Sequence, residues 1–189
     1  MRSGLILIDI QNDYFPGGYI ELFGMDWATQ NAQRLLNYFR ENQLPIFYIQ
    51  HFIKAEPVTN PFVQGTTGVE IHESVKPLKN ELVIPKYYPN SFRETNLLHE
   101  LKKAEVTELV ICGAMTHMCI DSTTRAAADL GFKCVVIYDA CATKDLVFRQ
   151  HLVLAREVHC AVLSALEAAY AQVLSVDEFL ALKADKALI

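Results

Sequence analysis

The chain has 189 residues, of which 51% are hydrophobic and 21% are charged, so the sequence predicts one globular domain covering residues 1–189. Its net charge is −5 and no cluster of Lys and Arg stands out, which argues against nucleic acid or a membrane surface as a partner. No apolar run reaches transmembrane length and no signal peptide precedes the first apolar run, so we expect a cytoplasmic location. The five cysteines are an odd number and three of them fall in strand-like runs, which favours reduced thiols.

Short apolar runs alternate with segments of helical periodicity along the chain. In chain order, the pattern predicts a strand at 5–9, a helix at 26–42, strands at 46–51 and 81–86, a helix at 95–103, a strand at 109–112, a helix at 116–130, a strand at 133–139, a helix at 146–158, a strand at 160–163 and a last helix from 179 to about 183. A capping box of Ser175 and Glu178 opens that last helix. Residues 52–78 are broken up by Pro and Gly and follow no period, and we expect them to cover a substrate.

The alternation of strands and helices predicts right-handed βαβ crossovers and a parallel sheet that is covered on both faces. Sites in such sheets lie beyond the carboxyl ends of the strands. Asp9 ends the first predicted strand, Lys86 ends the third, and Cys119 follows the fourth. We therefore expect an acid, a base and a thiol at one edge of the sheet.

Cys119 lies in the stretch Gly113–Arg125, which leads from a predicted strand into a predicted helix. Thr116 is a suitable N-cap there, which places Cys119 in the first turn, where unpaired N–H groups and the helix dipole favour the thiolate. The plainer interpretation of Cys119 is a small buried cysteine without a chemical role. Taken alone, Asp9 could equally cap the loop after its strand, and Lys86 could simply extend into solvent. Together the three favour a nucleophile, with Asp9 as its base and Lys86 stabilising the charges.

Three motifs resemble those of the isochorismatase-like cysteine hydrolases, in the order found in that family: Leu7-Ile8-Asp9-Ile10-Gln11-Asn12-Asp13-Tyr14-Phe15, then Ile84-Pro85-Lys86, then Gly113-Ala114-Met115-Thr116-His117-Met118-Cys119-Ile120-Asp121-Ser122-Thr123. The resemblance implies a three-layer α/β/α Rossmann-like fold with a parallel six-stranded sheet in the order 3-2-1-4-5-6. It also implies a catalytic triad of Asp9, Lys86 and Cys119. A cis peptide bond between Ala114 and Met115 is implied as well, with an oxyanion hole formed by the N–H groups of Met115 and Cys119.

The sequence departs from one branch of that family. Its nicotinamidases carry a metal site built on an Asp-x-His motif after the second strand, but here no Asp precedes His51, and His72 is the only other histidine before the third strand. We therefore expect no metal and no other cofactor. We expect His51 to line the substrate pocket, together with Phe15 and Tyr87. His117 lies two residues before the nucleophile, a spacing that points the two side chains apart on a helix, so we do not expect it to act as the base.

The segment around the nucleophile is most similar to that of metal-independent amidohydrolases. This resemblance implies hydrolysis of a C–N bond in a small amide, lactam or ureide through a thioester acyl-enzyme. In such a reaction Asp9 would protonate the leaving amine and activate water. Two alternatives stay open: a vinyl ether hydrolase of the isochorismatase type, which does not need the thiol, and a binding protein without activity. The resemblance further implies a small-molecule substrate and a homodimer or homotetramer.

Overall fold

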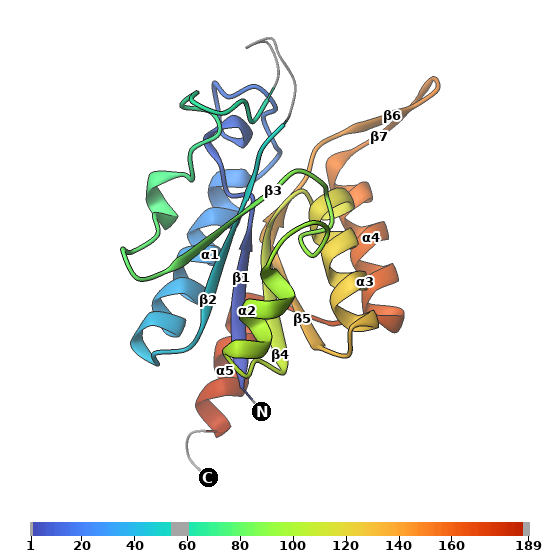
Figure 1. The fold of residues 1–189 in the computed structure, drawn as a ribbon. Coiled ribbons are helices and arrows are strands. Elements are labelled where there is room, and N and C mark those ends of the chain that lie inside the picture. The colour runs from blue at the N-terminus through green and yellow to red at the C-terminus, as the bar shows by residue number, and fades with distance from the viewer. Residues whose placement is uncertain (1, 54–60, 187–189) are drawn as a thin grey trace.

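The computed structural model describes residues 2–53 and 61–186, and it is built around a single sheet with helices on both faces (Figure 1). In chain order the elements are β1 (Ser3–Ile8), η1 (Asn12–Tyr14), α1 (Met25–Glu41), β2 (Ile46–His51), η2 (Glu73–Val75), β3 (Leu82–Lys86), α2 (Leu97–Lys103), β4 (Glu108–Ala114), η3 (Thr116–Ile120), α3 (Asp121–Asp129), β5 (Lys133–Ala142), β6 (Leu146–Phe148), β7 (His151–Val153), α4 (Ala155–Ala169), β8 (Gln172–Leu174) and α5 (Val176–Lys186). No helix within these two described ranges has the length and apolarity needed to cross a bilayer.

The six strands of the central sheet lie in the order β3-β2-β1-β4-β5-β8, and every neighbouring pair is parallel. With β8 as the sixth strand, this is the order 3-2-1-4-5-6, so the predicted fold is confirmed. β1 lies between β2 and β4, and all six of its residues are buried. A strand covered on both faces needs apolar side chains in both directions, which explains why this part of the sequence does not alternate.

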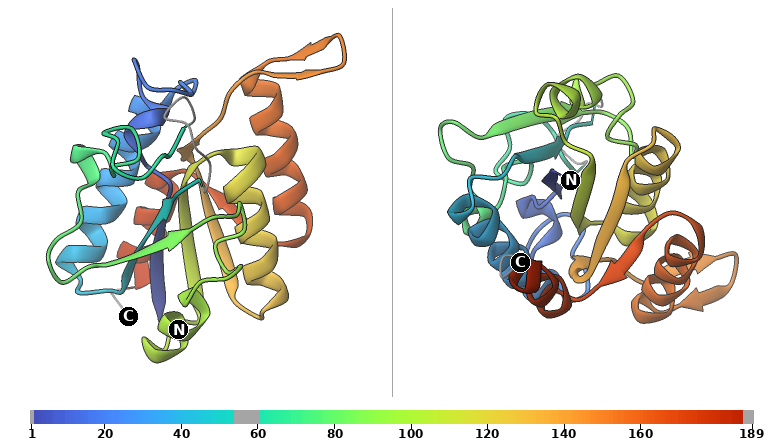
Figure 2. Two further views of the ribbon diagram at one scale, coloured as in Figure 1. Left: turned by 45° about the horizontal axis from the view of Figure 1, so that its top comes forward. Right: turned by 90° about the horizontal axis from the view of Figure 1, so that it is seen from below.

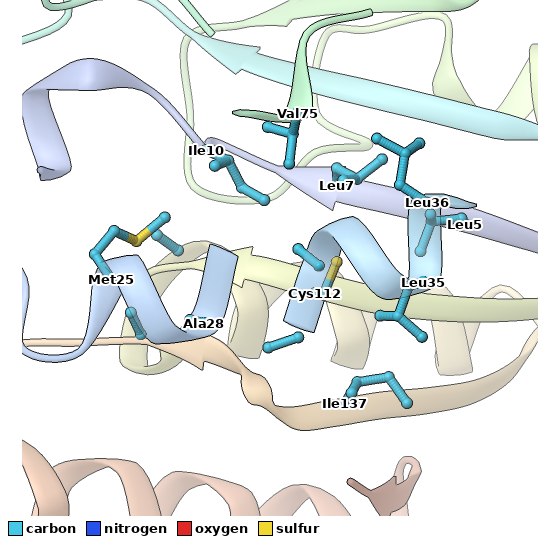
Figure 3. Close-up of a cluster of buried hydrophobic side chains, with 14 of the residues drawn as sticks. Leu5, Leu7, Ile10, Met25, Ala28, Leu35, Leu36, Val75, Cys112 and Ile137 are labelled. Atoms are coloured by element: carbon cyan, nitrogen blue, oxygen red, sulfur yellow. The ribbon is translucent and has the colours of Figure 1, made fainter. Parts of the chain in front are cut away.

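Successive residues of β1 contribute to two separate hydrophobic clusters. Leu5 and Leu7 pack with Leu35 of α1 on one face of the sheet, as Figure 3 shows. Ile6 and Ile8 point to the other face, into the cluster that includes residues of α2, α3 and α4. The view from below in Figure 2 shows the resulting layers, with α1 and α5 on one side of the sheet and α3 and α4 on the other.

The region from residue 146 to residue 163 differs from the prediction. The predicted helix at 146–158 is wrong, because β6 and β7 form an antiparallel hairpin that extends away from the body of the molecule (Figure 2). Val147, Phe148 and Leu152 are 68%, 69% and 60% exposed, so their spacing does not mark the buried face of a helix. The predicted strand at 160–163 is also wrong and lies inside α4. A window of four apolar residues is too short to separate a strand from one turn of a helix.

The last helix starts three residues earlier than predicted, directly after Ser175. The predicted capping box is present. Ser175 Oγ accepts a hydrogen bond from the N–H of Glu178 at 3.2 Å, and the Glu178 carboxylate accepts one from the N–H of Ser175 at 2.7 Å. The box satisfies donors of the first turn, so the helix begins at Val176.

Candidate active site

Asp9 lies where β1 ends and the chain turns away from the sheet. Its N–H still donates to the carbonyl of Ile49 in β2 at 3.0 Å, but its φ of 53° is in the left-handed region, which is uncommon for a residue with a side chain. The side chain is fully buried, and within the described part of the chain no group donates a hydrogen bond to Oδ1. The turn therefore leaves a buried carboxylate at the carboxyl edge of the sheet.

Lys86 is the last residue of β3, and its side chain reaches back to Asp9. Both side chains are 0% exposed, Lys86 Nζ lies 2.8 Å from Asp9 Oδ2, and the ammonium also donates to the carbonyl of Pro89 at 3.0 Å. Burial alone would lower the pKa of Lys86, but Asp9 and Cys119 together outweigh burial and raise the pKa above its ordinary value. Burial would likewise raise the pKa of Asp9, but Lys86 and His51 hold it below its ordinary value. The two groups thus form a buried ion pair that is charged on both sides at neutral pH.

Cys119 lies in η3, a π-helical turn that connects β4 to α3. The peptide bond between Ala114 and Met115, at the end of β4, is cis. Met115 is the N-cap of this turn, so the predicted capping role of Thr116 is wrong. The Thr116 hydroxyl is fully buried and instead donates to the carbonyl of Ala142 at 3.2 Å, because a buried hydroxyl needs a partner in the interior.

The thiol of Cys119 is protonated at neutral pH, contrary to the thiolate expected from its place at the start of a helix. Burial raises its pKa, the Asp9 carboxylate raises it further, and Lys86 only partly opposes them, so that the pKa is raised to about 12. A transfer of the thiol proton to Asp9 would remove the carboxylate charge and leave a thiolate near the Lys86 ammonium. The net charge of the buried cluster is the same before and after that step.

Gly113 allows β1 and β4 to approach closely next to these residues. It pairs with Ile8, has a φ of 124°, and a Cβ at this position would lie 2.0 Å from the Ile8 carbonyl oxygen. Any other residue would therefore push the two strands apart at the point where one leads to Asp9 and the other to Cys119.

His51 adds a fourth polar group to the cluster. Its Nδ1 lies 3.5 Å from Asp9 Oδ2 and 3.9 Å from Cys119 Sγ. The side chain of Gln11 holds the backbone of His51 by accepting its N–H at 2.8 Å and donating to its carbonyl at 3.0 Å. Gln11 thereby continues the pairing with β2 after the main chain has turned away at Asp9. We did not identify Gln11 from the sequence, because its role depends on that turn.

Asp13 joins the loop after β1 to the segment that starts at residue 61. Its buried carboxylate accepts the N–H of Phe62 at 2.6 Å and that of Tyr19 at 3.4 Å. Phe62 has a φ of 58°, and the centre of its ring lies 5.4 Å from that of His51. Part of the segment predicted to cover the substrate therefore packs against the site, while residues 54–60 of that segment lie outside the described residues.

The structure places the other two predicted pocket residues, Phe15 and Tyr87, against other aromatic rings. Phe15 is buried in the hydrophobic core and stacks on His72 with 3.7 Å between ring centres. Tyr87 is 41% exposed, with its ring centre 6.3 Å from that of Phe52. Their roles in substrate binding remain predictions.

Asp9, His51 and Cys119 are residue types that bind transition metals, and their ligand atoms lie within 4.8 Å of one another. A divalent cation bound by all three would, however, lie beside the Lys86 ammonium, which is already 2.8 Å from Asp9. Two buried cations would then share one carboxylate, which is unfavourable in a low-dielectric interior. The donor set therefore suits an ammonium–carboxylate pair better than a resident metal.

The fold and the site define a class of protein: a parallel α/β domain that buries an acid, an ammonium and a thiol at the carboxyl edge of its sheet. The family model "Isochorismatase domain" matches residues 3–178, and the chain belongs to the isochorismatase family of hydrolases. It is similar to the isochorismatase family protein YddQ of Bacillus subtilis (strain 168), with 47% identity over 180 residues that cover 95% of this chain and 99% of YddQ.

Solved structures agree with this assignment. A crystal structure from Oleispira antarctica, described as an isochorismatase hydrolase, matches with a TM-score of 0.91 and 46% identity over 95% of this chain and 96% of that one. An isochorismatase structure from Pseudomonas putida KT2440 matches with a TM-score of 0.87 and 32% identity over 94% of this chain and 89% of that one.

Proposed function

We propose that this protein hydrolyses a C–N bond of a small amide, lactam or ureide through a thioester on Cys119, without a metal. The observation that carries the proposal is the burial of the thiol together with an ion pair whose Asp9 Oδ2 and Lys86 Nζ are 2.8 Å apart. Two relatives support it. A streptothricin hydrolase of Streptomyces noursei is 31% identical over 76% of this chain and 56% of that protein. The ureidoacrylate amidohydrolase RutB of Cronobacter turicensis is 26% identical over 74% of each chain.

In the proposed acylation, the Cys119 thiol gives its proton to Asp9 as the sulfur attacks the carbonyl carbon of the substrate. The N–H groups of Met115 and Cys119 would stabilise the oxyanion that forms, a contribution commonly worth about 3 kcal/mol for each donor. The protonated Asp9 then gives its proton to the departing amine. Lys86 keeps the carboxylate ionised between these steps and offsets the charge on sulfur.

A set of small lactams, ureides and linear amides, assayed with the wild type and with Cys119→Ala, tests this proposal. The variant should keep its fold by circular dichroism and lose turnover completely. A vinyl ether hydrolase would instead retain turnover of isochorismate in Cys119→Ala and lose it in Asp9→Asn. A protein that binds members of the set without converting any of them would be a binding protein, and the proposal would be wrong.

We also propose that the protein forms a homodimer or homotetramer. Several large apolar side chains are open to solvent in the single chain, among them Phe23 and Trp27, which are 75% and 67% exposed. Exposed aromatic residues of this kind are typical of contact surfaces. Light scattering coupled to size-exclusion chromatography gives the oligomeric state directly, and a monomer at micromolar concentration would contradict this proposal.

A further inference from the structure

We infer that Thr123 is a positioning residue, whose hydroxyl fixes the Pro89 carbonyl and, through that carbonyl, the Lys86 ammonium beside Asp9. Its relevance to catalysis rests on the proposed function, in which Lys86 offsets the charges on the carboxylate and the sulfur. Thr123 itself takes no part in the proposed chemistry and acts only through Lys86.

The Lys86 ammonium has a second anchor besides its ion pair with Asp9. An attraction between opposite charges favours a short distance, whereas a hydrogen bond also favours one direction. Lys86 Nζ lies 2.8 Å from Asp9 Oδ2, and it donates a hydrogen bond to the Pro89 carbonyl at 3.0 Å. The position of the Pro89 oxygen therefore helps to determine where the buried positive charge lies relative to Cys119.

Pro89 belongs to the turn at residues 87–90, which follows β3 and is partly open to solvent. A proline has no N–H, so this residue cannot be fixed by donating a backbone hydrogen bond. The start of the turn is held at Lys86, whose carbonyl accepts the N–H of Phe52 at 2.9 Å. The turn ends at Ser91, which is fully buried. The Pro89 carbonyl is thus placed by the contacts that the end of the turn makes with the rest of the molecule.

The Thr123 hydroxyl makes those contacts. It accepts the N–H of Ser91 at 3.0 Å, lies 2.9 Å from Ser91 Oγ, and donates to the Pro89 carbonyl at 3.4 Å. Thr123 and Ser91 are both 0% exposed, so water is not at hand to replace these bonds. Because a buried polar group without a partner is costly, the hydroxyl favours one arrangement of the turn.

The same helical segment carries both this anchor and the nucleophile. Thr123 lies in the first turn of α3 and follows Cys119 by four residues, a spacing that places two side chains on one face of a helix. The hydroxyl therefore ties the turn after β3 to the element that holds the sulfur. A shift of this segment would move the thiol and the anchor of Lys86 together.

Thr124 offers a matched comparison. It also lies in α3 and is 0% exposed, but its hydroxyl has no hydrogen-bond partner among the described residues. Thr124→Val and Thr123→Val make the same change of shape at neighbouring buried positions. A difference between the two variants therefore reports the hydrogen bonds of the Thr123 hydroxyl.

The test measures iodoacetamide labelling of Cys119 between about pH 7 and pH 10, located by mass spectrometry, in the wild type and in three variants. The Lys86 charge lowers the pKa of Cys119, so an ammonium that loses its place should leave less thiolate. Thr123→Val should be labelled about three to ten times more slowly at each pH, because the thiolate fraction falls tenfold for each pH unit by which the pKa rises. Thr123→Ser keeps the hydroxyl and Thr124→Val keeps the turn, so both should be labelled at the wild-type rate.

A role in packing alone would have the opposite effect, because a looser structure around a thiol that is only 2% exposed speeds labelling. Unchanged or faster labelling of Thr123→Val therefore overturns the inference. Equal slowing in Thr124→Val, or slow labelling that Thr123→Ser does not restore, overturns it as well. Circular dichroism checks the fold of each variant. If Thr123→Val is unfolded, Thr123→Ala takes its place, since it removes the same hydroxyl without a methyl group against the turn.

Turnover tests the proposed function separately. If the wild type converts no member of the amide set, the proposed function fails, while the labelling rates still decide whether Thr123 positions the ammonium. If the wild type converts a member of the set and Thr123→Val is labelled like the wild type, the inference fails and the proposed function stands.

Discussion

Two regions of this molecule depart from the usual pattern of apolar side chains inside and charged side chains at the surface. At the carboxyl edge of the sheet, Asp9 and Lys86 are charged and 0% exposed. In the β6–β7 hairpin, Val147 and Phe148 are apolar and 68% and 69% exposed. The buried charges depend on each other for their stability, whereas the exposed apolar residues leave most of their side-chain surface in contact with solvent. Substitutions in the first region should therefore affect stability and activity, and those in the second should affect neither.

The largest effect is expected for Lys86→Ala. This substitution leaves the Asp9 carboxylate buried without its ammonium partner, which typically lowers the free energy of unfolding by about 3–5 kcal/mol, and turnover should be lost. The matched control is Lys76→Ala, which removes a Lys–Glu73 pair with side chains 67% and 80% exposed. It should change the unfolding free energy by less than about 1 kcal/mol. Urea denaturation measures the unfolding free energy of both variants. Equal losses of stability would show that the burial of the Asp9–Lys86 pair does not determine its contribution.

An intermediate effect is expected on the reactivity of Cys119. Because its pKa is raised to about 12, the thiolate fraction should rise about tenfold with each pH unit from 7 to 10, and iodoacetamide labelling should follow without a plateau. The Asp9 charge raises this pKa and the Lys86 charge lowers it. Asp9→Asn should therefore speed labelling, and Lys86→Ala should slow it. Labelling located by mass spectrometry distinguishes Cys119 from the exposed Cys160. A plateau below pH 8 would show that the resting residue is a thiolate.

The smallest effect is expected for Phe148→Ser in the hairpin. The side chain is 69% exposed, so its replacement should change the unfolding free energy by no more than about 0.5 kcal/mol and should leave turnover unchanged. Thermal melting, activity and the oligomeric state are compared with those of the wild type. A large loss of stability that accompanies a change in oligomeric state would show that this residue is buried between subunits.

Much of the fold could be predicted because its strands are covered on both faces. β1 and β4 are therefore continuous apolar runs that can be recognised without any partner, and the carboxyl ends of parallel strands meet at one edge. The hairpin and the edge strand β8 could not be predicted in this way. The hairpin exposes its apolar residues, and β8 has only three residues, Gln172–Leu174, whose pairing with β5 is not visible in their own pattern.

The sequence predicted which residues form the candidate site better than it predicted their contacts and charges. Asp9, Lys86 and Cys119 follow from strand ends and motifs, and the structure brings them together with His51. Gln11 and Asp13 were missed because each acts on a segment about 40 to 50 positions away along the chain, His51 and Phe62 respectively. Thr116 was misread because its hydroxyl bonds to Ala142 in β5 instead of to its own helix.

The sequence by itself determined the first five strands of the sheet and the residue types at its carboxyl edge, and its motifs indicated the family and, through it, the strand order. Only the tertiary structure decided the charge on each group. A pKa depends on burial and on the charges nearby, and at this site those come from β1, β2, β3 and η3 together. That is why Cys119, which its local sequence marks as a thiolate, is a thiol in the folded protein.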